Sequence, residues 1–384
     1  MYLKYFLLFL CYNPINSITL EEEVRDNIFH NYDPKIRPVL NYNDAVNLSI
    51  SIKIKNIENF NQVTETLFLN LWIIYEWEDK FLKWNYTQYP LKKISVKQEN
   101  VWVPDLVLYN AAQKPNVYNL GEYMRLDYNG KLKLIKPLTY GFTCSLDLHN
   151  FPYDQQYCHM DFGSWQFHNK YLYIFSYPEN NTIDYINNQG EWEISSLSNN
   201  NQQLEYLCCP DEYWSVIKYE LTLKRYPKAY NIFILMTILL TITACIINIF
   251  NYKIYTRTYV LIFIPLTIIW LIQSMSKKIP VIGYFSKIDT LLLTSFIICE
   301  LCTLQSGLLF NLNKNKNYYL KVTNNQNYQY NNSKSKEKNL ITKEYNSVRY
   351  DDEKLDNYLV FFDNVFKYLI LFSYIIFLFV ILYS

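Results

Sequence analysis

The sequence has little glycine and little histidine, with 7 Gly and 4 His among 384 residues. The histidines show no metal-ligand spacing, and no phosphate-binding glycine loop, G-x-S-x-G motif or H-E-x-x-H motif is found. The sequence therefore lacks the signatures of nucleotide-binding enzymes, α/β-hydrolases and zinc peptidases. We therefore predict that the chain is not an enzyme and that it uses neither a cofactor nor a metal.

An excess of charge is missing as well. The 36 Lys and Arg residues and the 35 Asp and Glu residues leave a formal net charge of +1 at pH 7. Nucleic-acid-binding domains usually carry a clustered positive excess. The charge balance therefore gives no reason to expect nucleic acid as a partner.

Long apolar runs are present in the C-terminal part of the chain. They cover residues 232–250, 258–272, 288–312 and 359–383. A helix needs about 20 apolar residues to cross a bilayer. The second run is short and contains Pro265, and the third carries Glu300, which needs a partner or a watery face in lipid. We predict a four-helix transmembrane bundle built from residues 229–312 and 358–384.

The N-terminal 17 residues resemble a secretory signal peptide. Lys4 precedes a short apolar run, and small or polar residues follow it. A signal peptide followed by four spans places both termini of the mature chain outside the cell. The Lys-rich, polar segment 313–357 is then predicted to be a flexible cytoplasmic loop, in keeping with the excess of basic residues inside.

Residues 18–228 are predicted to form an extracellular all-β sandwich of the immunoglobulin-like kind. Short runs of alternating apolar and polar residues continue from 46 to 223, separated by polar turns. A helix is expected before them, at 21–30, because acidic residues fill its first turn. Glycosylation sequons on this exported surface are expected at Asn47, Asn85 and Asn180.

The eight cysteines are divided between the membrane part, the signal peptide and two pairs in the exported domain, Cys144 with Cys158 and Cys208 with Cys209. Such pairs in an exported segment indicate an oxidising compartment. A disulfide between Cys144 and Cys158 would close a compact loop and stabilise the fold by about 3 kcal/mol. The adjacent pair can close only a small ring, which stiffens a loop tip and adds almost no loop-closure stability.

Four motifs of the exported domain combine aromatic residues with turn residues. They are the cysteine-framed loop with Phe151-Pro152, Asp154 and Gln156, the run Trp102-Val-Pro-Asp105 to Tyr109-Asn110, the run Phe162-Gly-Ser-Trp165, and the run Tyr206-Leu-Cys208-Cys209 to Tyr213. A quaternary ammonium offers no proton for hydrogen bonding, but aromatic ring faces attract it by about 0.5–2 kcal/mol each. A cluster of these aromatic residues is therefore predicted to bind an organic cation.

Together the motifs resemble those of the Cys-loop, or pentameric ligand-gated, ion-channel family, and in particular nicotinic acetylcholine receptor subunits of the α type. The resemblance covers nearly the whole chain. It implies a subunit of a homo- or hetero-pentamer in contact with membrane lipid, which binds acetylcholine or a related amine and opens a cation pore. It also implies a location in the plasma membrane, at the postsynaptic side.

The resemblance assigns roles to individual residues. The principal face of the agonist site is expected to comprise Tyr109, Trp165, Tyr206 and Tyr213, capped by a disulfide between Cys208 and Cys209. Trp77 is expected on the complementary face offered to a neighbouring subunit. Coupling to the pore is expected through Phe151, Pro152, Asp154 and Arg225.

Several positions depart from the nicotinic pattern. Asp161 stands where α subunits usually carry Lys, and Ser215 stands where they carry an acidic residue. The proline of the first span and the Gly-Glu-Lys step at the inner mouth of the pore are missing. These departures favour two alternatives: a membrane-anchored subunit that binds or assembles without conducting, and an anion-selective member of the superfamily.

The register of the second span has two alternatives from the sequence. An ungapped count back from Pro280 puts the inner mouth near 248–250, gives Tyr259 the place of the usual gate leucine, and leaves Arg257 facing or flanking the pore. If the helix starts near Thr258 instead, Arg257 belongs to a cytoplasmic loop. An arginine in the conduction path would oppose cations.

Overall fold

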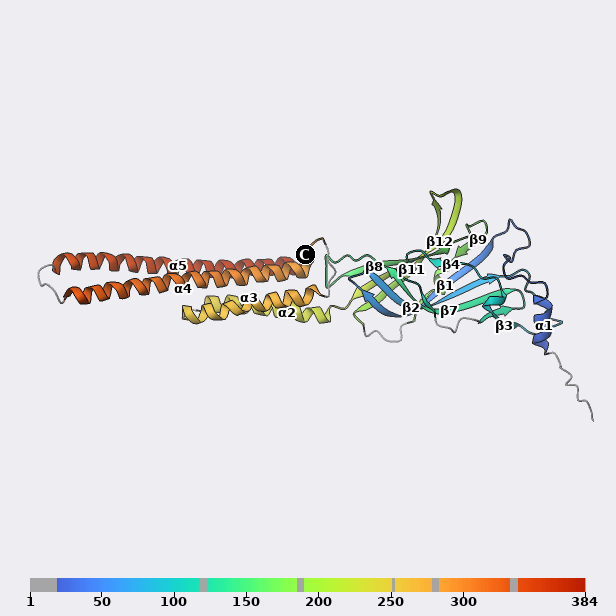
Figure 1. The fold of residues 1–384 in the computed structure, drawn as a ribbon, viewed down its shortest axis with the longest axis horizontal. Helices are drawn as coiled ribbons and strands as arrows, with labels where there is room; N and C mark the ends of the chain where they lie inside the picture. The colour runs from blue at the N-terminus through green and yellow to red at the C-terminus, as the bar shows by residue number, and fades with distance from the viewer. Residues whose placement is uncertain are drawn as a thin grey trace, which may run out of the picture.

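The computed structural model describes residues 19–117, 123–184, 190–250, 253–277, 283–331 and 338–383. The predicted signal peptide lies outside these residues. A β sandwich forms one end of an elongated molecule and a bundle of helices forms the other (Figure 1). The predicted fold class, an all-β sandwich with an N-terminal helix plus a four-helix bundle, is confirmed.

Helix α1 (Leu20–Phe29) begins where the sequence predicts a helix. The Thr19 side chain accepts a hydrogen bond from the Glu22 backbone, and the Glu22 carboxylate accepts one from the Thr19 backbone, which makes a capping box. Glu21, Glu22 and Glu23 lie in the first turn, where the helix dipole favours negative charge. Val24 and Ile28 are buried against the sandwich.

The larger sheet of the sandwich has eight strands, and its strand order includes β10-β1-β2-β7-β6-β3. Strand β5 pairs with β7, and β9 pairs with β1. The strands are β1 (Val46–Asn61), β2 (Thr66–Glu78), β3 (Lys93–Lys97), β5 (Asn116–Val117), β6 (Tyr123–Asp127), β7 (Lys131–Thr143), β9 (Leu172–Phe175) and β10 (Thr182–Ile183).

The smaller sheet has the order β11-β12-β8-β4. Its strands are β4 (Leu106–Leu108), β8 (Gln155–Ser164), β11 (Trp192–Tyr206) and β12 (Cys209–Arg225). The β11–β12 hairpin projects from the body of the sandwich (Figure 1). Strand β12 then runs without interruption to Arg225, next to the first membrane helix.

The core between the sheets follows from alternation along the strands. Leu48, Ile50, Ile52 and Ile54 of β1 are all fully buried, and residues of β2, β7, β8 and β12 complete the same cluster. Successive side chains of a strand point to opposite faces, so every second residue enters the core. Each fully buried aliphatic side chain contributes about 1.5–3 kcal/mol of hydrophobic free energy.

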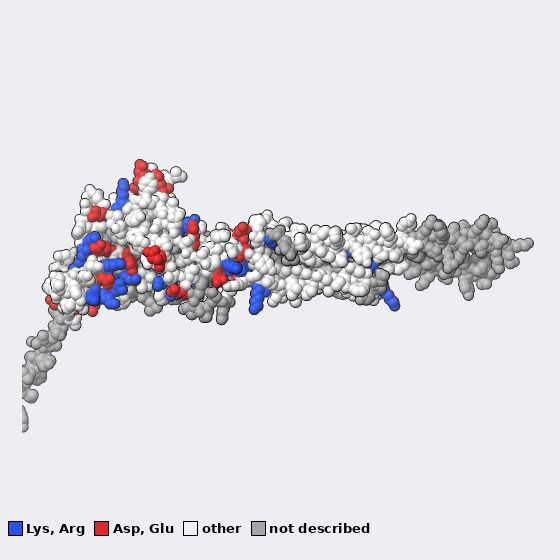
Figure 2. Space-filling model, turned by 180° about the vertical axis from the view of Figure 1, so that it is seen from behind, with Lys and Arg blue, Asp and Glu red and all other residues white. Residues whose placement is uncertain are grey.

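The helical part comprises α2 (Lys228–Ile249), α3 (Ile254–Ser276), α4 (Lys287–Asn331) and α5 (Lys338–Tyr383). All four are long and apolar enough to cross a membrane. Charged side chains spread over the sandwich, whereas the described surface of the helices is almost free of them (Figure 2). The C-terminus lies at the end of the bundle that adjoins the sandwich (Figure 1).

Two expectations about the helices are wrong. Segment 313–357 was expected to be a flexible loop, but α4 continues to Asn331 and α5 begins at Lys338. The segment contains neither glycine nor proline, and extending an existing helix avoids the cost of nucleation. Helix α3 begins at Ile254, so Arg257 lies in its first turn rather than in a loop, while 248 and 249 still belong to α2.

A candidate cation-binding site and its link to the membrane helices

The predicted principal-face residues come from neighbouring parts of the smaller sheet. Tyr109 follows β4, Trp165 follows β8, Tyr206 ends β11, and Tyr213 lies in β12. Trp165 is 73% exposed, Tyr206 37% and Tyr213 45%, so their rings are available at the surface. Burial, followed by the charges of Tyr206 and Asp105, raises the pKa of Tyr109. The hydroxyl of Tyr109 therefore stays neutral at physiological pH.

The loop that carries Trp165 is held by Asp105. One carboxylate oxygen of Asp105 accepts hydrogen bonds from the backbone N–H groups of Trp165 (3.1 Å) and Gln166 (2.8 Å). The other accepts from the Ser164 hydroxyl at 2.5 Å, and the Ser164 Oγ accepts from the Phe167 N–H at 2.8 Å. Two of the aromatic motifs thus meet here, because Asp105 of the first motif holds the turn of the second.

Tyr109 lies directly against the strand before Trp165. Its hydroxyl donates a hydrogen bond to the Ser164 carbonyl oxygen at 2.6 Å. The ring lies over Gly163, where an added Cβ would be 2.6 Å from the Tyr109 Cζ atom. Glycine at this position therefore allows the close approach of Tyr109.

The hairpin tip brings the side chains of Cys208 and Cys209 together. Their sulfur atoms lie 2.7 Å apart, and both cysteines are unbonded in the structure. A disulfide needs about 2.05 Å between its sulfur atoms. The two sulfur atoms are within reach of each other, and the disulfide between Cys208 and Cys209 stays a prediction.

The prediction for Trp77 is wrong. Trp77 is only 2% exposed, and its ring packs edge-on against Trp102 with centroids 6.5 Å apart. Trp72, on the same strand, is 41% exposed. The two residues are an odd number of positions apart, so they point to opposite faces of the sheet. Trp72 is the tryptophan of this strand that a neighbouring molecule can reach.

The two departures from the nicotinic pattern lie close to the aromatic residues. Burial, followed by the charge of Asp161, raises the pKa of Tyr206. Asp161 contacts His159, with 3.4 Å between its Oδ2 and the ring Nε2, while its buried Oδ1 has no hydrogen-bond partner among the described residues. Ser215 is 4% exposed, and its hydroxyl is likewise unpartnered among those residues.

At the other end of the sandwich, the cysteine-framed loop meets the helices. Cys144 and Cys158 form the predicted disulfide, and the peptide bond between Phe151 and Pro152 is cis. Leu148 and Phe151 are fully buried in a cluster with residues of α2, α3 and α4, namely Tyr230, Met275, Ile288 and Leu292. The loop tip is therefore inserted between the starts and ends of the membrane helices.

Arg225 is the centre of a buried ionic group beside this cluster. Its Nε and Nη2 atoms donate to the two oxygens of Asp154 at 2.7 and 3.0 Å, and its Nη1 atom contacts Glu191. The guanidinium lies 4.0 Å from the Trp192 ring centroid. Arg225 and Asp154 are 2% and 3% exposed, so this pair has little contact with water. The predicted coupling residues are thus all assembled in one place.

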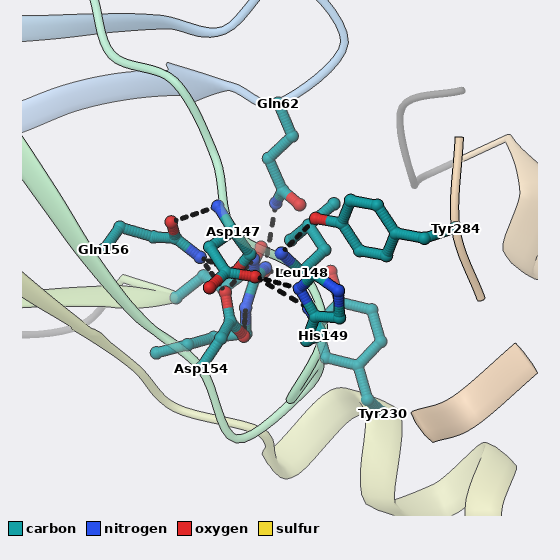
Figure 3. Close-up of polar contacts among 10 residues, drawn as sticks. Gln62, Asp147, Leu148, His149, Asp154, Gln156, Tyr230 and Tyr284 are labelled. Atoms are coloured by element: carbon teal, nitrogen blue, oxygen red, sulfur yellow. Dashed lines mark hydrogen bonds and ion pairs between the residues drawn. The ribbon is translucent and has the colours of Figure 1, made fainter. Parts of the chain in front are cut away.

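Further polar contacts cross from the loop to the helices (Figure 3). Glu191 accepts hydrogen bonds from Gln62 at 3.2 Å and from the Tyr230 hydroxyl of α2 at 2.8 Å. The Tyr284 hydroxyl accepts from the Leu148 N–H at 2.8 Å, and its ring stacks on His149 with centroids 3.9 Å apart. No local sequence pattern indicates a role for Tyr284, because its partners are distant in the chain.

A second polar cluster lies inside the helical bundle. Arg257 of α3 is 3% exposed; its Nε donates to Ser306 of α4 at 3.1 Å, and its Nη1 lies 3.5 Å from Asp363 of α5. Asp363 also contacts Lys367, with 2.5 Å between the charged atoms. Asn248 of α2 joins the cluster through Gln305. Arg257 therefore points into the bundle of its own chain.

The sequon residues all lie at the surface. Asn47, Asn85 and Asn180 are exposed. Asn85 folds back on its own sequon, because its side-chain oxygen accepts hydrogen bonds from the Thr87 backbone and hydroxyl. These positions are compatible with glycosylation, which stays a prediction.

Comparison with known proteins shows which family this architecture belongs to. Residues 21–227 match the model of the neurotransmitter-gated ion-channel ligand binding domain. The acetylcholine receptor subunit alpha-type des-2 of Caenorhabditis elegans is 31% identical over 229 residues, which cover 57% of this chain and 41% of that protein. The acetylcholine receptor subunit alpha-1-B of Xenopus laevis is 28% identical over 303 residues, 76% of this chain and 66% of that protein.

A third relative is the neuronal acetylcholine receptor subunit alpha-4 of Gallus gallus. It is 30% identical over 290 residues, which cover 72% of this chain and 46% of the relative. The matched part of this chain thus spans between 41% and 66% of the length of these three proteins.

Proposed function

Because the chain belongs to the neurotransmitter-gated ion-channel family, we propose that it is a receptor subunit that binds acetylcholine or a related ammonium ligand at subunit interfaces. The observation that carries this proposal is the group of exposed aromatic rings around Trp165, on a loop fixed by Asp105. A rigid, exposed tryptophan face is the best protein surface for an organic cation.

In this proposal the ligand lies between two chains of a pentamer. One chain supplies Tyr109, Trp165, Tyr206 and Tyr213, and the hairpin tip with Cys208 and Cys209 closes over the ligand. The neighbour supplies Trp72, which takes the role first expected of Trp77. Since a ligand shifts a conformational equilibrium only by its differential affinity, the closed hairpin has to bind the ammonium more tightly than the open one.

The link to the membrane runs through contacts described above. Strand β12 carries Tyr213 near the ligand and Arg225 beside Asp154, and α2 begins three residues after Arg225. Phe151 packs on Tyr230 of α2, with ring centroids 4.7 Å apart. We infer that closure of the hairpin moves the start of α2 and the end of α3 through this cluster.

Two observations bear on the pore. Arg257 is buried in its own bundle, so it is removed from a conduction path along the exposed face of α3; this disfavours the anion-selective alternative. That exposed face carries Tyr255, Tyr259, Phe263 and Trp270. Five copies of such bulky rings around one axis would narrow a pore, and this favours a subunit that binds ligand and conducts poorly by itself.

The test is whole-cell recording during rapid acetylcholine application to cells that display the chain at their surface. One set of cells expresses the chain alone, and the other co-expresses a related subunit. We expect a current in the second set that Trp165→Ala abolishes and the control Trp77→Phe preserves. A current unchanged by Trp165→Ala, or none in either set despite surface display, contradicts the proposal. The reversal potential reports selectivity.

A further inference from the structure

The outward face of the larger sheet carries a tryptophan whose ring already has a cation on it. Trp72 lies near the middle of β2 and is 41% exposed. The Lys55 ammonium of β1 lies 4.0 Å from the centroid of the Trp72 ring. An ammonium within about 6 Å of a ring centroid interacts with the negative face of that ring.

Lys55 is held in this position by a second contact. Its ammonium donates a hydrogen bond to Asp184 Oδ2 at 3.0 Å. Asp184 is itself fixed beside β1, because its backbone N–H donates to the Ile54 carbonyl oxygen at 2.8 Å and the preceding strand β10 pairs in parallel with β1. The Lys55 side chain is only 23% exposed, in agreement with an ordered position on the ring.

A tethered cation has a large advantage over a free one. Because Lys55 is attached to the neighbouring strand, its effective concentration at the ring is of the order of millimolar or higher. A ligand ammonium has to displace it or share the same π system with a like charge. The cation–π attraction of this ring is then already used by the protein and is lost to the ligand.

We propose that Lys55 is a built-in competitor that weakens the binding of ammonium ligands at the face this chain offers through Trp72. The inference rests on the proposed function, since it concerns the same interface. The two faces of the chain therefore differ in their affinity for ammonium ligands. The chain serves well as the principal side, through Trp165, and poorly as the complementary side, so a productive site pairs it with a different subunit whose tryptophan is uncovered.

The experiment measures equilibrium binding of labelled acetylcholine to membranes from cells that express the full chain alone. Lys55→Gln removes the charge and keeps the length of the side chain, so we expect its dissociation constant to fall about 10-fold. Lys55→Arg keeps a cation on the ring and should bind like the wild type. Adding Trp72→Ala to Lys55→Gln should remove the gain.

Lys53→Gln is the matched control. Lys53 lies on the same strand and pairs directly with Trp72 in the ladder, but among the described residues the ring contact belongs to Lys55. An equal gain from Lys53→Gln would show a general charge effect and overturn the inference. An unchanged affinity of Lys55→Gln, or no detectable binding by that variant at the surface, overturns it as well.

Trp165→Ala in the Lys55→Gln background separates this inference from the proposed function. If Lys55→Gln gains affinity and Trp165→Ala removes all binding, both stand. If Lys55→Gln gains affinity but binding survives Trp165→Ala, the competitor role stands and the assignment of the principal face fails. If Lys55→Gln gains nothing while Trp165→Ala abolishes the binding of a co-expressed assembly, only the competitor role fails.

Discussion

Single residues at the aromatic site act through close contacts. Gly163 touches the ring of Tyr109, and the Tyr109 hydroxyl reaches the next residue of the same strand. A methyl group on Gly163 has no room unless the ring moves. If Tyr109 contacts the ligand as proposed, the binding affinity depends on Gly163 through the position of this ring.

For Gly163→Ala we expect a loss of about 1–3 kcal/mol of stability, because overpacking forces side chains out of their preferred positions. Ligand affinity should fall with it as Tyr109 is displaced. The measurements are thermal unfolding of the solubilised chain and equilibrium acetylcholine binding. Gly190→Ala is the control, since an added Cβ there meets no atom closer than 3.9 Å. Unchanged values for Gly163→Ala would contradict this account.

Asp154 illustrates the energetics of a buried ion pair. Removing its charge leaves Arg225 among the rings of Trp192, Phe151 and Tyr230, with Glu191 as its remaining counter-ion among the described residues. We expect Asp154→Asn to cost about 3–5 kcal/mol of stability. The exposed pair of Lys80 and Glu78 provides the control: Lys80→Gln should cost less than about 1 kcal/mol. The two losses are compared by measuring the surface yield and the thermal unfolding of both variants, and equal losses would contradict this account.

At the scale of elements, the sequence predicted what depends on local pattern. Alternation along β1 and the acidic first turn of α1 predict a strand and a helix, as found. The local pattern does not distinguish Trp72 from Trp77, because both lie in β2. They differ in which face of the sheet they occupy, and that depends on how β2 packs against the rest of the sandwich. Contacts such as Tyr284 with Leu148 join residues 136 positions apart, which no local pattern encodes.

The prediction of a flexible loop at 313–357 rested on the polar composition of the segment. A polar, Lys-rich composition is typical of flexible loops, but the segment has no glycine or proline to stop a helix. In the structure the two flanking membrane helices simply continue into this segment. Composition predicts solvation, whereas helix ends depend on residues that stop a helix.

The membrane helices are joined by the cluster around Asp363, which faces both Arg257 and Lys367. Asp363→Asn removes the charge of the carboxylate that both Arg257 and Lys367 contact, and we expect the loss at the buried Arg257 to cost about 3–5 kcal/mol, seen as a lower yield of surface protein. Glu300→Gln, another acid-to-amide change in the bundle, should have a much smaller effect because Glu300 is half-buried with Thr303 as its neighbour.

The double variant Asp363→Asn with Arg257→Gln tests the pairing itself. Removing both charges should recover part of the yield, since coupled residues are non-additive. If the double variant is as poor as the sum of the two single variants, Asp363 acts through other contacts.

At the scale of the whole molecule, the arrangement predicts the topology of the chain in the membrane. The C-terminus lies at the sandwich end of the bundle, and the end of α4 and the start of α5 lie at the opposite end (Figure 1). An epitope tag at the C-terminus should therefore be labelled on intact cells. A tag inserted at 332–337 should be labelled only after permeabilisation, and the reverse pattern would exclude the proposed orientation.

Strand β12 has a kinetic consequence. Tyr213 and Arg225 lie on one unbroken strand, separated by about 40 Å at the usual rise per residue, and the strand is paired along most of that length with β11 and β8. Within this stretch the ladder with β11 has one register shift, between Ile194 and Ser196 of β11, while β12 itself continues unbroken. Under the proposed function, we therefore expect a delay between ligand capture and channel response to arise at the two ends of β12, in the hairpin tip or in the short step from Arg225 to α2.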